Sequence, residues 1–170
     1  SFFDKNMFPK NCYQQNEFNF FKKKFNNKSK KTSQVLIMGK PFIDYNFLKE
    51  YSYATILNII KEKYANSEIL YFPHPKEDLK HLKKFKSFKV LKSIFPLEIF
   101  IFKTKRMPKT IVSFNSSAVI PIKIFNKEIK IDNFFIDFKD RKKMTYEYKK
   151  YFPREYQIRN YFNKISIKTK

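Results

Sequence analysis

The sequence is poor in cysteine, in acidic residues and in long apolar runs. Its single cysteine, Cys12, excludes an internal disulfide and fits a reducing compartment. No apolar run approaches the roughly 20 residues that a helix needs to span a bilayer. The chain starts Ser1-Phe2-Phe3-Asp4, with neither an initiator methionine nor the basic-then-apolar pattern of a signal peptide. We interpret this start as the cut end of a longer polypeptide.

The shortage of acidic residues leaves a large positive charge. The 170 residues include 37 Lys+Arg against 15 Asp+Glu, which is a formal net charge of +22. This balance favours an anionic partner, either nucleic acid or the face of a membrane. The composition has a second explanation. One glycine, no tryptophan and abundant Lys, Asn, Ile, Phe and Tyr are typical of an AT-rich genome, in which many lysines are solvated and have no specific task.

The chain does contain short apolar runs separated by polar segments. With 42% hydrophobic residues it can bury the core of one domain. Strands are expected in four runs: 35–38, 68–72, 88–91 and 110–114. Helices are expected in four others: from 46 or 52 to 64, over 76–86, from Pro96 onward, and around 146–152. The segment 119–131 fits either a helix or an alternating strand.

In the first of these helices, one apolar face is expected to comprise Ile56, Leu57, Ile59, Ile60 and Tyr64. Strands that alternate with helices favour an α/β fold, in which a parallel sheet is covered on both faces. We divide the chain into a basic linker or remnant of a preceding domain over 1–33, an α/β domain over 34–140 and a helical tail over 141–170.

Ligands of such sheets bind beyond the carboxyl ends of the strands. Three segments follow expected strands and are therefore of interest: Gly39-Lys40-Pro41, Pro73-His74-Pro75 and Asn115-Ser116-Ser117. Proline fixes its own backbone and restricts the residue before it. His74 lies between two prolines and allows two interpretations. It either binds an anionic oxygen or transfers a proton, or it is an ordinary turn residue with no chemical role.

Ser116 and Ser117 also allow two interpretations. If a helix begins there, its free amide groups and dipole favour a phosphate. The alternative is an ordinary helix cap. A metal site built from His74 and His81 is not expected, because the spacing is unsuitable and no cysteine partner is available.

In this order, the segments resemble bacterial sialyltransferases. The resemblance rests on a strand ending in His74-Pro75, then Pro96-Leu97-Glu98, then a strand running into Ser116-Ser117. It extends over about 34–125 and includes the lead-in from Leu36 to Pro41. The sequence looks most like glycosyltransferase family 52, the lipooligosaccharide sialyltransferases. The capsule polysialyltransferases are more distant relatives with similar motifs.

The resemblance implies the Rossmann-like, C-terminal domain of a two-domain GT-B glycosyltransferase. It implies an inverting, metal-independent transfer of sialic acid from CMP-sialic acid to a lipooligosaccharide or capsule glycan. His74, Ser116 and Ser117 would contact the donor phosphate, and Glu98 would bind the ribose hydroxyls. Gly39 and Pro75 are included among the donor-binding residues, and no other cofactor is expected.

The sequence departs from that family in one motif. Family members carry an acidic-Asp-Gly motif in the N-terminal domain that supplies the general base. Here the only glycine, Gly39, follows Met38, so the motif is absent. The general base is therefore not assigned, and we expect this chain alone to be a truncated, weakly active or inactive enzyme.

The implied partners are a CMP-sugar donor and a glycan acceptor that ends in galactose. A cytoplasmic location, peripheral contact with an anionic inner membrane and a homodimer are further expectations from the resemblance. A basic nucleic-acid-binding protein is the alternative. Its lysines and 19% aromatic residues would contact phosphates and stack on bases. Against it, the sequence has no zinc motif and no RNP-like stretch, and its lysines are spread along the chain.

Overall fold

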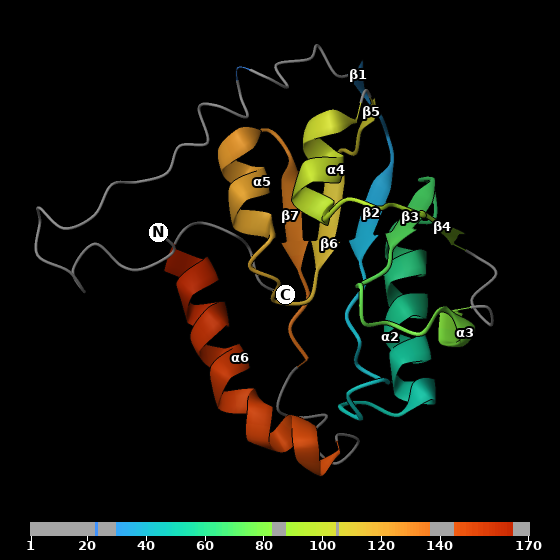
Figure 1. The fold of residues 1–170 in the computed structure, drawn as a ribbon, viewed down its shortest axis with the longest axis vertical. Helices are drawn as coiled ribbons and strands as arrows, with labels where there is room; N and C mark the ends of the chain where they lie inside the picture. Colours follow the sequence, from blue (N-terminus) through green and yellow to red (C-terminus); the bar gives the residue numbers. More distant parts are fainter. Residues whose placement is uncertain (1–22, 24–29, 83–87, 105, 137–144, 165–170) are drawn as a thin grey trace, which may run out of the picture.

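A computed structural model describes residues 23, 30–82, 88–104, 106–136 and 145–164. Its centre is a five-stranded parallel sheet with the order β4-β3-β2-β6-β7 (Figure 1). The strands are β2 Val35–Met38, β3 Ile69–Phe72, β4 Lys89–Val90, β6 Thr110–Ser113 and β7 Lys130–Asn133. The four strands expected from the sequence are thereby confirmed.

The strand order shows how the chain builds the sheet. From β2 it moves outward to β3 and β4, then returns to the other side of β2 to add β6 and β7. Four helices follow the strands: α2 Glu50–Lys63, α3 Leu79–Leu82, α4 Leu97–Lys103 and α5 Val119–Phe125. This order confirms the Rossmann-like α/β fold. The reversal of direction lies between β2 and β6, the place at which such folds bind ligands.

One face of the sheet is covered by α2. Tyr53, Leu57 and Ile60 of this helix are buried against the strands, with Ile60 fully inaccessible. Their spacing of three and four residues is that of one helical stripe. The expectation for Ile59 was wrong, because this residue is 52% exposed. It directly precedes Ile60 and is rotated by about 100° from it, out of the stripe that the sheet can cover.

The opposite face is covered by α4 and α5, which lie side by side (Figure 1). Ile101 of α4 and Ile122 of α5 are fully buried in a second core cluster with Leu36 and Ile111 of the sheet. Both strands are buried along their whole length. β2 is accordingly a continuous apolar run, as expected for a parallel sheet, whereas β6 begins with Thr110 and ends with Ser113.

A long C-terminal helix, α6 Tyr146–Lys164, passes the carboxyl ends of the strands (Figure 1). It is much longer than the helix expected around 146–152. Tyr148 is buried in the first core cluster, where its ring packs against Phe42 and Phe47. Phe162 is buried in the second cluster. The helix therefore packs on both sides of the domain, while the division into three parts stays a prediction.

Two expected segments differ from the structure. The helix expected over 76–86 begins only at Leu79, because the preceding residues form a turn that starts at His74, and residues 83–87 are not described. The ambiguous segment 119–131 contains both alternatives, α5 and the start of β7. A small parallel pair of strands, β1 Lys30–Lys31 and β5 Arg106–Met107, was not expected.

Within the described ranges, no helix has the length and apolar character needed to cross a membrane.

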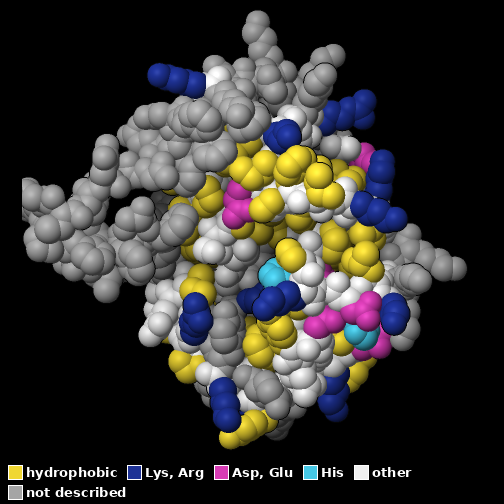
Figure 2. All heavy atoms as spheres, viewed as in Figure 1, with side chains coloured by type: hydrophobic (Ala, Val, Ile, Leu, Met, Phe, Trp, Pro, Cys, Tyr) yellow, Lys and Arg dark blue, Asp and Glu magenta, His cyan; other side chains and the backbone are white. Residues whose placement is uncertain are grey.

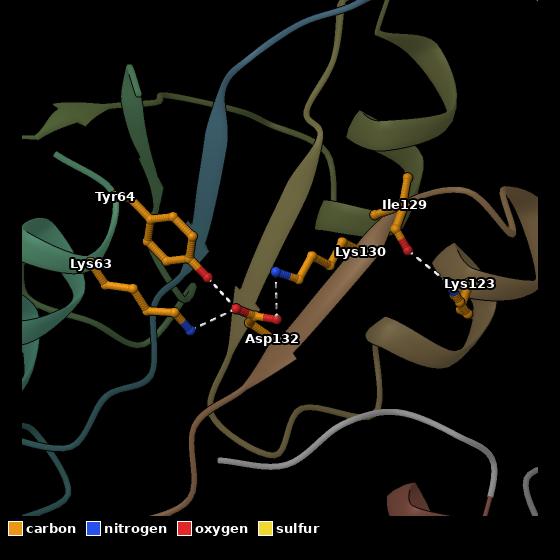
Figure 3. Close-up of polar contacts among 6 residues, drawn as sticks. All are labelled: Lys63, Tyr64, Lys123, Ile129, Lys130 and Asp132. Atoms are coloured by element: carbon orange, nitrogen blue, oxygen red, sulfur yellow. Dashed lines mark hydrogen bonds and ion pairs between the residues drawn. The ribbon is translucent and has the colours of Figure 1, made fainter. Parts of the chain in front are cut away.

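The edge strand β7 is joined to α2 by a buried acid (Figure 3). Asp132 is 1% exposed, and its Oδ2 accepts hydrogen bonds from the Lys63 ammonium at 2.7 Å and from the Tyr64 hydroxyl. The Lys130 ammonium lies 3.7 Å from the other carboxylate oxygen. Two lysines and a tyrosine thus compensate one buried carboxylate, as a charge at such a position requires.

Candidate functional site

The candidate site lies at the carboxyl edge of the sheet, where the segments after β2, β3 and β6 meet. Figure 2 shows histidine and basic side chains close to one another among hydrophobic ones, near where Figure 1 shows these strands ending. The sheet order places β2 between β3 and β6. A ligand over the end of β2 can therefore be reached from both neighbouring segments.

After β3 the chain makes a tight turn that starts at His74. The Glu77 N–H donates to the His74 carbonyl at 2.9 Å, and the Lys76 N–H donates to the His74 Nδ1 at 3.1 Å. In return, the Glu77 Oε2 accepts the His74 N–H at 3.0 Å. The Glu77 side chain thus reaches back to the N–H of the residue three positions earlier, as the glutamate of a capping box does, and Pro75 fixes the backbone between them. The imidazole is held by its own turn.

The same hydrogen bonds define the protonation of His74. Because Nδ1 accepts the Lys76 N–H, the neutral ring carries its proton on Nε2. Burial lowers the pKa of His74, and the positive charges of Lys76 and Lys40 lower it further, against a smaller opposite effect of Asp44. At neutral pH the free protein therefore presents a neutral imidazole whose Nε2–H is a donor for an anionic oxygen.

Glu77 lies beneath this turn and was not identified from the sequence. Its Oε1 accepts the Tyr71 hydroxyl at 2.5 Å, and the Tyr71 oxygen lies 2.7 Å from the Tyr53 hydroxyl. Burial raises the pKa of Glu77 to about 7, although the hydrogen bonds from Tyr71 and His74 oppose this shift. A proline followed two residues later by glutamate is the sequence signal of such a turn.

Gly39 is packed directly against this network. A Cβ atom at Gly39 would lie 2.3 Å from the Glu77 Oε2, 2.8 Å from the Tyr71 hydroxyl and 3.0 Å from the His74 backbone nitrogen. The structure therefore brings Gly39 and His74 together and explains why only glycine fits. Direct contact of Gly39 with the donor stays a prediction.

Lys40, in the segment after β2, interacts with the segments after both neighbouring strands, β3 and β6. Its ammonium donates a hydrogen bond to the Phe114 carbonyl at 3.1 Å, across the point where the strand order reverses. Its charge also acts on His74, whose pKa it lowers. A cation thus lies between the segments after β3 and β6. Sequence reasoning noted Lys40 after a strand but assigned it no role, because its partner lies 74 residues further along the chain.

After β6, a buried pair of asparagines shapes the chain. Asn115 has a positive φ of 54°, and its N–H donates to the Asn133 Oδ1 at 2.8 Å. The Asn133 Nδ2 donates back to the Asn115 Oδ1, so the ends of β6 and β7 hold each other. Positive φ is uncommon for a residue other than glycine and is several-fold enriched in asparagine.

Ser116 takes part in the turn before α5. Its Oγ accepts the Ala118 N–H at 3.4 Å within this turn. The N-cap of α5 is Ala118, without a side-chain hydrogen bond, so the helix-cap alternative is not what the structure shows for either serine. Its hydroxyl hydrogen can still be donated to a ligand. Ser117 is exposed. Binding of the donor phosphate by these serines stays a prediction.

Glu98 is half-buried in the first turn of α4. This helix packs against α5, which begins shortly after the two serines. Binding of the ribose hydroxyls by Glu98 stays a prediction. Among the described residues, no three His, Cys, Asp or Glu side chains form a potential metal site.

Comparison with known proteins identifies the family. The family model of alpha-2,8-polysialyltransferase (POLYST) matches residues 3–132, which is more than half of the chain. The match spans Gly39, His74, Glu98 and both serines of the candidate site. Comparison with curated proteins finds no match. The sequence resemblance included this family, although it placed the lipooligosaccharide sialyltransferases nearer. The chain belongs to the alpha-2,8-polysialyltransferase family.

Proposed function

We propose that the carboxyl edge of the sheet binds CMP-sialic acid and that the chain takes part in inverting, metal-independent transfer of sialic acid to a glycan. Family membership supports a glycosyltransferase with a nucleotide-sugar donor and a glycan acceptor. The observation that carries the finer proposal is the position of Lys40. Its ammonium lies at the reversal point of the sheet, between the turn of His74 and the serines after β6.

The proposed chemistry follows from the charge that develops during transfer. When the bond between sialic acid and phosphate breaks, the sugar becomes oxocarbenium-like and the departing CMP phosphate gains negative charge. The Nε2–H of His74, the ammonium of Lys40 and the hydroxyls of Ser116 and Ser117 would stabilise that charge. Groups that bind the departing phosphate more strongly than the intact donor lower the barrier.

The proton of the acceptor hydroxyl needs a separate base. Both oxygens of Glu77 accept hydrogen bonds, from Tyr71 and from the His74 backbone, so its carboxylate is directed into the protein. We therefore assign no general base. Ribose binding by Glu98, a galactose-terminated acceptor on lipooligosaccharide or capsule, a homodimer, a cytoplasmic location and contact with an anionic membrane stay predictions.

The first test concerns the nucleotide. With chelator present, calorimetry is expected to show binding of CMP that is stronger than binding of UMP or AMP. Raising the salt concentration should weaken this binding only modestly, because one phosphate is involved. Nucleic-acid binding through several phosphates falls steeply with salt. Equal affinity for the three nucleotides would contradict the proposed donor site, and tight, salt-sensitive binding of an oligonucleotide would favour the alternative function.

The second test concerns the histidine. His74→Ala is expected to weaken CMP binding by roughly 10- to 150-fold, which corresponds to the loss of a charge-assisted hydrogen bond of about 1.5–3 kcal/mol. Binding of cytidine, which lacks the phosphate, should change little. His81→Ala in α3 is the matched control, because its imidazole faces Asp44 at 4.0 Å. Similar CMP affinity of the two variants would show that His74 does not bind the phosphate.

A further inference from the structure

We propose that Glu77 is a positioning residue that holds the His74 imidazole in the orientation required at the edge of the sheet. The role of His74 in donor binding rests on the proposed function above. The placement of its ring by Glu77 does not depend on that function, and it is supported by contacts within the protein alone.

The carboxyl group of Glu77 joins the turn to the rigid part of the fold. On one side, its Oε1 accepts the hydroxyl of Tyr71, a fully buried residue of β3. The Tyr71 oxygen in turn contacts the hydroxyl of Tyr53, which is 1% exposed on α2. On the other side, its Oε2 accepts the backbone N–H of His74. The sheet and α2 thus hold the carboxyl group, and the carboxyl group holds the first residue of the turn.

A second set of hydrogen bonds fixes the orientation of the His74 imidazole. Glu77 also closes the turn through its own N–H, which donates to the His74 carbonyl, and the closed turn places the Lys76 N–H on the His74 Nδ1. One side of the imidazole is occupied in this way, and Nε2 is left for a ligand. Removal of the carboxyl group would free the His74 N–H and loosen the bond to Nδ1.

The surroundings of Glu77 make its hydrogen bond to the His74 N–H sensitive to pH. Three groups act on its carboxyl group: the Tyr71 hydroxyl from β3, the His74 backbone N–H from its own turn, and the charge of Asp44 from the segment after β2. The Tyr53 hydroxyl of α2 contacts Tyr71 from behind. Burial raises the pKa of Glu77 to about 7. Near neutral pH the carboxyl group therefore gains a proton as pH falls, and the ionised form is the stronger acceptor for the His74 N–H.

The test follows the His74 ring by NMR in the full 170-residue chain, labelled with ¹⁵N. In the wild type we expect the Nε2–H tautomer to dominate, slow exchange of the His74 and Lys76 amides, and a step in the ring shifts near pH 7. Glu77→Gln should remove this step. Glu77→Ala should also shift the tautomers toward the mixture of free imidazole and speed both amide exchanges at least tenfold. Glu62→Gln, an exposed change in α2, is the control.

The outcomes separate this proposal from the proposed function. If both Glu77 variants keep the wild-type tautomer ratio and amide exchange, Glu77 does not position His74 and the proposal is overturned. If Glu77→Ala does not fold, the tautomer ratio and titration of Glu77→Gln decide. CMP binding is measured on the same samples. A wild-type protein that shows the expected ring behaviour but binds no CMP would overturn the donor site and leave the role of Glu77 supported.

Discussion

Gly39→Ala is expected to weaken CMP binding by at least as much as His74→Ala, and to lower the free energy of unfolding by about 1–3 kcal/mol, the usual cost of overpacking. The added methyl group would lie 2.3 Å from the Glu77 Oε2, well inside contact distance. The carboxyl group must then move away and release the His74 N–H that it accepts at 3.0 Å. Calorimetry with CMP and urea unfolding measure the two effects.

A double substitution shows whether this contact is the cause. Glu77→Ala removes the atom nearest to the new methyl group, although the Tyr71 hydroxyl at 2.8 Å and the His74 backbone nitrogen at 3.0 Å would remain. The double variant should therefore be more stable than the sum of the two single changes predicts, since residues in contact are not additive. CMP binding should stay weak, because the turn has lost its acceptor. Additive losses, or a fully stable Gly39→Ala protein, would contradict this explanation.

Asp132→Ala is expected to lower the free energy of unfolding by about 3 kcal/mol, near the lower end of the range for removal of one partner from a buried ion pair. The change leaves the ammonium groups of Lys63 and Lys130 without the carboxylate that they share (Figure 3). The cost is limited because the side chain of Lys63 is 29% exposed and can be hydrated. Urea unfolding measures the effect, with Glu62→Gln as an exposed control.

The same residue should contribute to acid unfolding. Burial raises the pKa of Asp132, but the hydrogen bonds from Lys63 and Tyr64 and the charges of Lys63 and Lys130 outweigh it, so the pKa is lowered. The stabilisation is present above the unfolded pKa of about 3.9 and is lost as pH falls through the lower folded pKa. Asp132→Asn should therefore flatten the fall in stability below about pH 4. An unchanged acid profile would show that another group is responsible.

Glu77 should act in the opposite direction and in another pH window. Its folded pKa of about 7 is above the ordinary value of 4.5, so the folded state keeps a proton that the unfolded state has lost between these values. Stability from this group therefore decreases as pH rises from about 4.5 to about 7. Glu77→Gln should flatten that part of the profile and leave the part below pH 4 as in the wild type.

Much of the fold was predictable because its signals are local. Short apolar runs ended by glycine or proline define β2 and β3, and their lack of alternation indicates burial on both faces. The two strand-end motifs, at His74 and at Ser116, were found for the same reason. β7 was not separated from α5, because apolar residues recur across 119–131 and the polar residues between them, chiefly Asn126-Lys127-Glu128, form only a short interruption.

The contacts that determine the site were not predictable, because they join segments far apart in the chain. Lys40 meets the Phe114 carbonyl 74 residues away, and Lys63 meets Asp132 69 residues away. In a chain with 37 basic residues, no local pattern distinguishes these two lysines from solvated ones. The same applies to Ile59, whose exposure depends on how wide a stripe of α2 the sheet covers.

The sequence by itself indicated the α/β class, a relation to bacterial sialyltransferases and the two motifs at the edge of the sheet, since these depend on short runs of neighbouring residues and on their order along the chain. Only the tertiary structure decided that Gly39 must be small, that Lys40 lies at the reversal point and that Glu77 carries a raised pKa. The physical reason is that packing distance, burial and Coulomb interaction depend on positions in space. Neighbouring parallel strands are joined by long crossover connections, so residues that meet at the edge of the sheet are far apart in the sequence. A local sequence pattern therefore cannot show that they are in contact.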